Sequence, residues 1–349
     1  MSSQLIYPFS FGDRGQSDLL GGKGANLAEM VRIGLPVPPG FTITTEACQQ
    51  FLATGEVPKG LASEIDASLK VLEKSLDKEF GNPNKPLLVS VRSGAKFSMP
   101  GMMETVLNVG MTPEVTEQMA IRTGDSRFAW DSYRRFVDMY ARIVCDVPQA
   151  EFHKIENRVL ASFGAATIQE LEAEGLKSLA DGYKKVSEAL TGEIFPVDPR
   201  EHLMKSVEAV FHSWNSERAQ LYRRRERIPS DLGTAVNIQS MVFGNLSDDS
   251  GTGVAFTRNP ATGEQGSYGD YLQRAQGEDV VAGIRNTMSL AEFNELSPKV
   301  YGELDRVMTL LEDHYHDLCD IEFTVEEGKL WILQTRVGKR TAEAAFRIA

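Results

Sequence analysis

The pattern of apolar residues changes twice along this chain, and this change constrains its fold more than any single motif. Residues 1–110 mix strand-like and helix-like segments, whereas residues 113–227 have few glycines and apolar residues three and four apart, as in a helix. Strand signals return at 234–243, 253–257 and 319–336. The sequence therefore predicts a mixed α/β fold of the α+β kind with a helical insertion, and its 349 residues favour more than one subdomain.

The charge of the chain limits the ligands it can hold. The 37 basic and 49 acidic residues give a formal charge of −12, which argues against a nucleic-acid binder that relies on overall positive charge. The basic run YRRRER at 222–227 is more typical of a solvated helix end, because its charges fan around the helix axis. A polyphosphate ligand would therefore need a local cationic cluster.

The cysteines and the apolar segments indicate a compartment. Cys48, Cys145 and Cys319 are widely spaced and lack the spacing of a disulfide framework or a zinc site. The first residues lack a basic n-region and an apolar h-region, and no run of about 18 apolar residues follows. We therefore expect a cytoplasmic protein that is neither secreted nor embedded in a membrane.

The segment CDIEFTVEEGKLWILQTR, residues 319–336, predicts a β-hairpin. Two alternating runs flank Glu326, Glu327 and Gly328, and a three-residue loop favours glycine at its third, left-handed position. The expected pairs are Val325 with Lys329, Phe323 with Trp331, Glu322 with Ile332, and Asp320 with Gln334. We expect one face to carry Asp320, Glu322 and Gln334 beside Leu330 and Ile332, and the other to carry Ile321, Phe323, Trp331 and Leu333.

The predicted polar face of this hairpin has two interpretations. Carboxylate and amide oxygens on a rigid sheet suit Mg²⁺, which also binds polyphosphate oxygens. The same face could be the solvent-exposed side of an ordinary antiparallel sheet. Arg336 favours the first interpretation, because a guanidinium on that face can donate a forked pair of hydrogen bonds to phosphate.

Two further segments offer groups that bind phosphates. Lys23 lies in GGKG before a predicted helix, although this is not a Walker A loop and could be a plain turn. Leu87 to Val91 is predicted to be a buried strand that ends at Arg92 and leads into a loop with Ser98 and Gly101. That loop could be a lid over phosphates, or an ordinary connection beside an exposed arginine.

The motifs LLGGKGANLAEM, LLVSVRSGAKFSMPGMMETVLNVG, GTGVAFTRNPATGE, AQGEDVVAGIR and DIEFTVEEGKLWILQTR together resemble the pyruvate phosphate dikinase family over essentially the whole chain. Phosphoenolpyruvate synthase and rifampin phosphotransferase share the architecture in looser form. The resemblance implies an ATP-grasp-type module of two lobes with a helical insertion. Its expected segments are a first lobe at 1–112, a helical subdomain at 113–200, a returning helix and strand at 201–243, and a second lobe at 244–349.

The resemblance also implies roles for individual residues. The phosphates of ATP would be bound by Lys23, Arg92 and Arg336. Mg²⁺ and the polyphosphate would be bound by Asp320, Glu322 and Gln334. The lid would span 98–103, with Ser98, Gly101, Met102 and Met103. Glu278 would contact the ribose, and the backbone of 239–242, with Gln239, Met241 and Val242, would hold the adenine.

The family's reaction converts ATP, phosphate and pyruvate into AMP, pyrophosphate and phosphoenolpyruvate through a phosphohistidine. None of His153, His202, His212, His314 or His316 has the sequence context of the family's phosphocarrier histidine, and the pyruvate-binding barrel is not recognised. We therefore expect a donor module, either cut at a domain boundary or naturally short, that works with a phosphohistidine domain and a barrel. The alternatives are a related phosphotransferase and a non-catalytic ATP sensor.

Overall fold

The computed structural model describes residues 4–281 and 286–348, and the chain divides into two compact units. The first unit contains residues 1–25 and 39–241, and the second contains residues 26–38 and 242–349. Helix α1 (Ser17–Arg32) contributes residues to both units. The predicted mixed α/β class is confirmed, whereas the predicted segments 1–112, 113–200, 201–243 and 244–349 stay a prediction.

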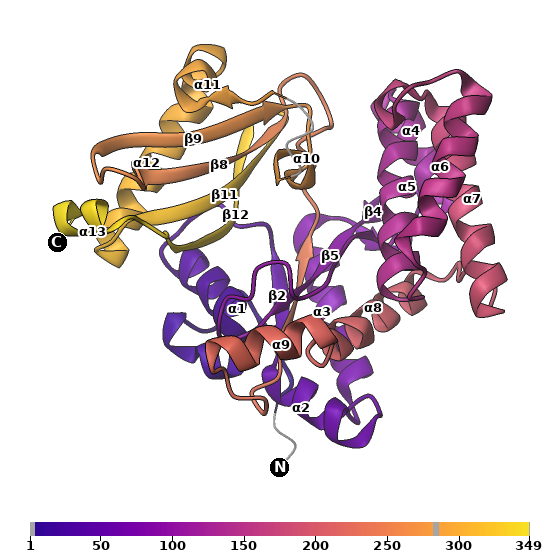
Figure 1. The fold of residues 1–349 in the computed structure, drawn as a ribbon, viewed down its shortest axis with the longest axis horizontal. Coiled ribbons are helices and arrows are strands. Elements are labelled where there is room, and N and C mark those ends of the chain that lie inside the picture. The colour runs from indigo at the N-terminus through magenta and orange to yellow at the C-terminus, as the bar shows by residue number, and fades with distance from the viewer. Residues whose placement is uncertain (1–3, 282–285, 349) are drawn as a thin grey trace. The chain divides into compact units, whose positions relative to one another are not determined.

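A five-stranded antiparallel sheet forms the centre of the first unit (Figure 1). Its order is β1 (Ile6–Pro8), β2 (Gly40–Ile43), β7 (Ala235–Ser240), β5 (Val89–Gly94) and β6 (Thr105–Val109). Strand β7 pairs with both β2 and β5, so a strand from late in the sequence completes a sheet begun near the N-terminus. All six residues of β7 are buried, which agrees with its central position in the sheet.

The first unit also contains helices. They are α2 (Thr45–Thr54), α3 (Leu61–Leu76), α4 (Pro113–Thr123), α5 (Ser126–Ile143), α6 (Gln149–Phe163), α7 (Ala173–Thr191), α8 (Pro199–Ser213) and α9 (Glu217–Glu226), with short 3₁₀ turns at Arg14–Gln16 and Ile168–Glu170. The helices from α4 onward lie in the predicted helical region 113–227. A two-stranded parallel pair, β3 (Glu79–Phe80) and β4 (Pro86–Leu87), completes the unit. Helix α2 starts at Thr45, where the Thr44 side chain accepts a hydrogen bond from the Ala47 N–H.

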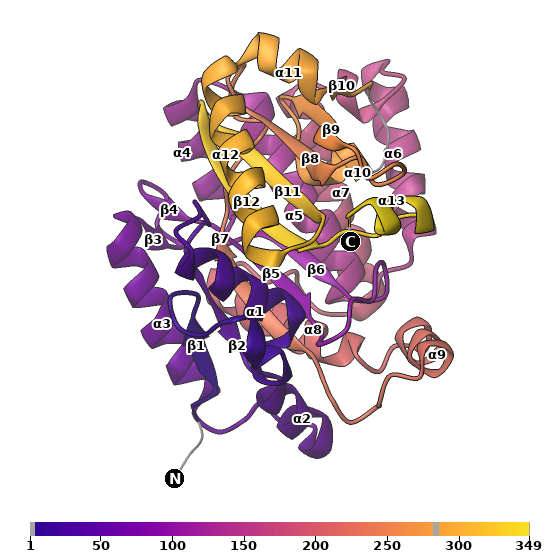
Figure 2. The ribbon, with the colours of Figure 1, turned by 90° about the vertical axis from the view of Figure 1, so that its left-hand side faces the viewer.

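The second unit also contains a five-stranded antiparallel sheet (Figure 2). Its order is β10 (Met288–Ser289), β9 (Gln265–Gln273), β8 (Gly251–Arg258), β11 (Cys319–Glu326) and β12 (Lys329–Val337). Its helices are α10 (Gly277–Val281), α11 (Leu290–Leu296), α12 (Pro298–Tyr315) and α13 (Ala342–Ile348). Helix α12 packs against β8, β11 and β12, and its buried Leu304, Met308 and Leu311 contribute to the core. In the described ranges, no helix combines the length and the hydropathy that crossing a bilayer requires.

A close backbone contact accompanies a kink inside helix α1. Gly21 interrupts the helix with φ 66° and ψ 167°, and a Cβ on it would lie 1.5 Å from the carbonyl oxygen of Gly94. The next residue, Gly22, donates its N–H to the carbonyl of Ala95 at 3.0 Å. Only glycine allows this approach, because an L side chain would meet the backbone of the strand end. The contact brings Lys23 to the end of β5.

Replacement of Gly21 by alanine should therefore lower the free energy of unfolding of the first unit by about 3 kcal/mol or more. Gly55 is a matched control, since it has φ 75° and no atom within 4 Å of an added Cβ. Gly55→Ala should cost about 1–2 kcal/mol, the usual penalty for a left-handed backbone. Urea titrations followed by circular dichroism would measure both values, and equal losses would contradict the close contact.

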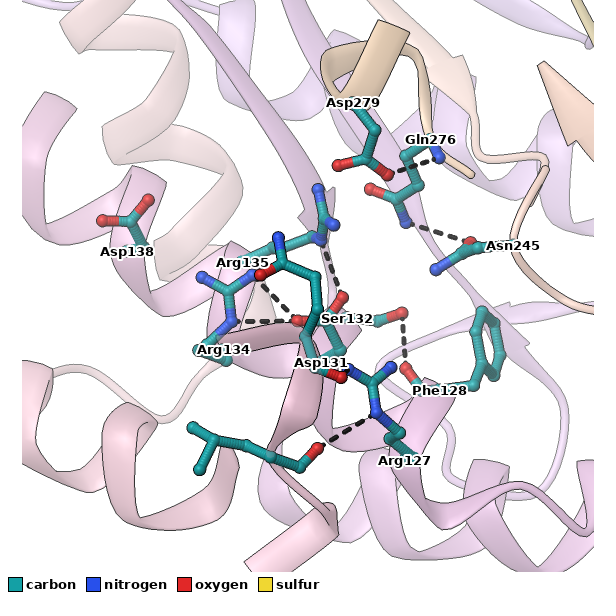
Figure 3. A network of polar contacts seen from close by, with 12 residues as sticks. Arg127, Phe128, Asp131, Ser132, Arg134, Arg135, Asp138, Asn245, Gln276 and Asp279 are labelled. Atoms are coloured by element: carbon teal, nitrogen blue, oxygen red, sulfur yellow. Dashed lines mark hydrogen bonds and ion pairs between the residues drawn. The ribbon is translucent and has the colours of Figure 1, made fainter. Parts of the chain in front are cut away.

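A buried ionic network holds helix α5 together (Figure 3). The Asp131 carboxylate accepts hydrogen bonds from Arg134 Nε at 2.9 Å, Arg134 Nη2 at 2.8 Å and Arg135 Nε at 2.8 Å. Asp131 is 7% exposed and Arg134 is 9% exposed. Burial alone would raise the pKa of Asp131, but the two guanidinium groups hold that pKa well below its usual range.

Asp131→Asn should destabilise the first unit by about 3 kcal/mol at pH 7, because it leaves a buried arginine without its counter-charge. A depressed carboxyl pKa stabilises the fold above the unfolded-state pKa of about 4 and loses that contribution as pH falls towards the folded pKa. The difference between wild type and Asp131→Asn in urea titrations should therefore shrink below about pH 4.

Asp138→Asn provides the control in the same helix. Asp138 pairs with Arg142 at 2.8 Å, but its side chain is 20% exposed and that of Arg142 is 34% exposed. A partly solvated pair of this kind contributes about 1 kcal/mol or less. Equal effects of the two substitutions at pH 7 would contradict the importance of the buried network.

Candidate functional site

The hairpin of β11 and β12 differs from the prediction at its turn. Glu326 pairs with Lys329, so the turn consists of Glu327 and Gly328 rather than three residues. Both turn residues have positive φ, 49° and 74°, as a type I′ turn requires. The predicted three-residue loop is therefore wrong, because Glu327 also adopts the left-handed conformation that we expected of the glycine alone.

A β-bulge then changes the register a second time. Phe323 pairs with Ile332 but Glu322 pairs with Gln334, so Leu333 is an additional residue in β12. Beyond the bulge Asp320 lies opposite Arg336 and not opposite Gln334 as predicted. Relative to the predicted register, the turn and the bulge each shift the pairing by one residue. Beyond the bulge the total shift is two residues, so each side chain lies on the face that was predicted for it.

The predicted polar face is therefore partly correct. Asp320, Glu322, Gln334 and Arg336 share one face of the hairpin, as expected. Leu330 and Ile332 do not lie beside the acids, since they pair with Val325 and Phe323 and are buried on the core face. Trp331 is opposite Thr324 on the polar side, where the Lys329 ammonium lies 3.9 Å from its ring centre.

The four polar side chains form two adjacent pairs. The Gln334 amide donates to a carboxylate oxygen of Glu322 at 3.0 Å, and Arg336 Nε donates to Asp320 Oδ2 at 2.7 Å. The Asp320 side chain is 11% exposed and that of Arg336 is 44% exposed, so this pair lies at the border between core and solvent. The arrangement offers carboxylate oxygens, an amide and a guanidinium on a single rigid surface.

These donors fit a hard cation that retains water or phosphate ligands. Among the described residues, no group of three or more His, Cys, Asp or Glu side chains is placed to hold a metal ion. Two carboxylates and an amide oxygen are too few for a closed protein cage, but Mg²⁺ is usually bound by one or two carboxylates together with waters and substrate phosphates. The polar face has the chemistry of such an open site.

In the first unit, the predicted phosphate binders lie within β5 and within α1. Arg92 lies within β5, which continues to Gly94, so its predicted place at the end of the strand is wrong. Arg92 Nη1 donates to Gln239 Oε1 of β7 at 3.4 Å. Lys23 follows the Gly21 interruption, and a Cβ on Gly94 would lie 3.5 Å from the Lys23 Cβ.

The predicted lid lies in the loop that joins β5 to β6, and one of its residues, Met99, is buried. Ser98 and Gly101 are exposed, whereas Met99 is 7% exposed and packs with Trp214 and Ala219. Met102 and Met103 are partly buried against the same cluster. The loop therefore has a fixed buried residue next to an exposed tip.

Helix α9 supports this anchor. Arg223 is 4% exposed, and its guanidinium carbon lies 4.1 Å from the centre of the Trp214 ring. The prediction of a solvated helix end at 222–227 is therefore wrong for Arg223. Arg218 pairs with Glu104 at the far end of the loop, and the Tyr222 hydroxyl donates to the Ser98 carbonyl at 3.5 Å.

The backbone predicted to hold the adenine, residues 239–242, includes the change from the first unit to the second. The N–H groups of Ser240 and Met241 donate to the carbonyls of Pro39 and Leu88, at 2.9 and 2.8 Å. Val242 begins the second segment of unit two, and Glu278 lies in the first turn of α10. The predicted site residues are thus divided between the two units.

The sequence did not predict three residues that contact the predicted lid or the segment after Val242. Met99 and Trp214 anchor the loop, and Glu326 accepts a hydrogen bond from the Phe243 N–H at 2.8 Å. The first two residues are 115 positions apart, so local patterns do not reveal their contact. Glu326 was predicted to be a loop residue because the turn was taken to be longer.

Comparison with known proteins identifies the family. The family model described as pyruvate phosphate dikinase, AMP/ATP-binding domain, matches residues 17–72, 52–294 and 285–348. The chain is 50% identical over 349 residues to pyruvate, phosphate dikinase of Clostridium symbiosum, which covers 99% of this chain and 40% of that relative.

Plant relatives show a similar likeness. The chain is 52% identical over 340 residues to pyruvate, phosphate dikinase 2 of Oryza sativa subsp. japonica, covering 97% of this chain and 38% of that protein. It is 51% identical over 341 residues to the chloroplastic pyruvate, phosphate dikinase 1 of Arabidopsis thaliana, covering 97% and 35%. The chain thus spans between 35% and 40% of the length of these three relatives. The chain belongs to the pyruvate phosphate dikinase AMP/ATP-binding domain family.

Proposed function

We propose that this chain binds MgATP and donates a phosphoryl group within a pyruvate phosphate dikinase. The observation that carries the proposal is the shared face of β11 and β12, where Asp320, Glu322, Gln334 and Arg336 gather. Membership of a family described as AMP/ATP-binding supports a nucleotide as the ligand. An ordinary solvent-exposed sheet face would not require a nearly buried carboxylate, that of Asp320, paired with the guanidinium of Arg336.

In this proposal, Glu322 and Gln334 hold Mg²⁺, and Asp320 orients Arg336 towards the polyphosphate. The Arg336 Nε already donates to Asp320, so the remaining N–H groups of the guanidinium can point at phosphate oxygens. Bound Mg²⁺ would neutralise negative charge on the phosphates. The protein residues then fix the direction in which the terminal phosphate points.

We also propose roles for the remaining predicted residues of both units. Lys23 and Arg92 would bind phosphates, Glu278 of the second unit would contact the ribose, and the backbone around Gln239, Met241 and Val242 would hold the adenine. The loop with Ser98, Gly101, Met102 and Met103 would be the lid. Phosphoryl transfer needs little covalent help from such residues, because positioning and charge stabilisation provide most of the catalysis.

The reaction that we propose for the whole enzyme converts ATP, phosphate and pyruvate into AMP, pyrophosphate and phosphoenolpyruvate. The acceptor would be a histidine of a separate phosphohistidine domain, and a barrel domain would bind pyruvate. The names of the relatives support pyruvate and phosphate as substrates. A cytoplasmic location stays a prediction.

MgATP at about a hundredfold over its dissociation constant should stabilise this chain by about 2.7 kcal/mol and raise its melting temperature. Glu322→Ala should lose most of the increase that depends on Mg²⁺, because it removes a proposed metal ligand. Thermal unfolding with ATP and Mg²⁺, with ATP and a chelator, and without ligand would measure the increase for each variant. No increase for the unsubstituted chain would refute the proposed function.

Glu327→Ala is the matched control. Glu327 has the same charge as Glu322 and lies in the same hairpin, but it is exposed in the turn. The control should retain the increase seen in the unsubstituted chain. If the two variants responded equally to MgATP, the assignment of Glu322 as a metal ligand would be wrong.

The anchored lid leads to a second test. Met99→Ala should remove the contact with Trp214 and speed tryptic cleavage after Lys96 by several-fold, because a loosened loop fits a protease better. Met99→Leu should keep the cleavage rate near that of the unsubstituted chain, since leucine fills similar volume. Mass spectrometry identifies the cut, and cleavage rates at other sites serve as the reference. Unchanged cleavage in Met99→Ala would mean that Met99 does not anchor the loop.

A further inference from the structure

Glu326 makes a contact that its place beside a hairpin turn does not explain. It is the last residue of β11, and its Oε1 accepts a hydrogen bond from the backbone N–H of Phe243 at 2.8 Å. Both residues belong to the second unit, and 83 positions separate them in the sequence. An ionised carboxylate that accepts from a backbone N–H makes a stronger bond than a neutral acceptor does.

The whole turn is joined to the segment that follows Phe243. The Gly328 N–H donates to the Asp249 carbonyl at 2.9 Å, and the Glu327 N–H donates to Ser250 Oγ at 3.0 Å. Several hydrogen bonds therefore join the turn to residues 243–250. The bond from the Phe243 N–H to Glu326 is the one at the start of that segment.

The same segment is also held by residues that precede Glu278. The Ala275 N–H donates to the Gly244 carbonyl at 3.0 Å, and the Arg274 N–H donates to the Ser250 carbonyl at 2.9 Å. A Cβ on Gly244 would lie 2.4 Å from the Ala275 carbonyl oxygen. The backbone at Gly244 therefore lies close against the backbone at Ala275, which holds the residue after Phe243 in place.

The peptide bond between Val242 and Phe243 contains the carbonyl of Val242 and the N–H of Phe243. A trans peptide is planar, and its C=O and N–H point in opposite directions. A carboxylate that fixes the N–H of Phe243 therefore also fixes the direction of the Val242 carbonyl. That carbonyl belongs to the backbone proposed to hold adenine, whose exocyclic amine is a hydrogen-bond donor.

We propose that Glu326 is a positioning residue for base recognition, which orients the Val242 carbonyl towards the amino group of adenine. The inference rests on the proposed MgATP-binding function and adds a source of base selectivity. Glu326 lies four residues from Glu322 along the same strand, a separation of about 13 Å, so the two carboxylates do not share one metal ion.

The test compares three ligands that differ in the base. MgATP has the exocyclic amine, the magnesium complex of inosine triphosphate has a carbonyl in its place, and magnesium tripolyphosphate has no base. Dissociation constants for the chain and its variants come from isothermal titration calorimetry. In the unsubstituted chain, we expect ATP to bind more tightly than inosine triphosphate.

Glu326→Ala should weaken ATP binding about five- to tenfold, the usual effect of losing one oriented hydrogen bond, and should leave tripolyphosphate binding within about twofold. The preference for ATP over inosine triphosphate should fall by the same factor. Glu326→Gln keeps an acceptor oxygen and should retain most of the preference. Glu327→Ala, with the same change of charge one residue away, should bind all three ligands as the unsubstituted chain does.

If Glu326→Ala does not fold, Glu326→Asp supplies the comparison, since it keeps the charge and withdraws the carboxylate by one methylene. An unchanged preference for ATP would overturn the inference, and so would equal weakening of all three ligands, which would indicate general damage. Failure of the unsubstituted chain to bind MgATP would remove the proposed function and this inference together. Normal MgATP binding with an unchanged preference would remove the inference alone.

Discussion

The candidate site of the second unit depends on which way side chains point from two paired strands. Side chains alternate between the faces of a strand, so a shift of one residue in the pairing would move Gln334 from the polar face to the core. The short turn introduces one such shift, and the bulge at Leu333 introduces another. Glu322 and Gln334 meet on one face because the two shifts occur together.

The first unit depends on a different constraint, the absence of a side chain at Gly21. Its backbone contacts the end of β5, and this contact places Lys23 close to the strand that carries Arg92. Cations are thereby concentrated in a protein whose formal charge is −12. Local geometry, and not overall charge, makes this chain a candidate for polyphosphate binding.

Much of the fold could be predicted from the sequence, since the predictions rested on strong local periodicity. Clear patterns mark the helical region 113–227 and the strands around β7 and β8. Strand β9 (Gln265–Gln273) was not predicted, because its sequence QGSYGDYLQ contains two glycines and few β-branched residues. Its strand conformation comes from pairing with β8.

The candidate site could be predicted in composition but not in detail. The acids and the amide were assigned to one face correctly, although each predicted pair was wrong. The segment KLWILQTR does not fix the position of a bulge, because its residues 330–333 are all apolar and each could face the core. The contact of Met99 with Trp214 depends on tertiary packing between distant segments, and no local pattern encodes it.

The bulge at Leu333 also determines which change of length the polar face tolerates. If the bulge were lost while every residue was retained, Leu333 would pair with Glu322, and Gln334 and Arg336 would turn to the opposite face. Deletion of Leu333 itself would remove the bulge without this change, because Ile332 would still pair with Phe323 and Gln334 with Glu322. Strand β12 can therefore lose this one residue and keep the side chains of its polar face where they are.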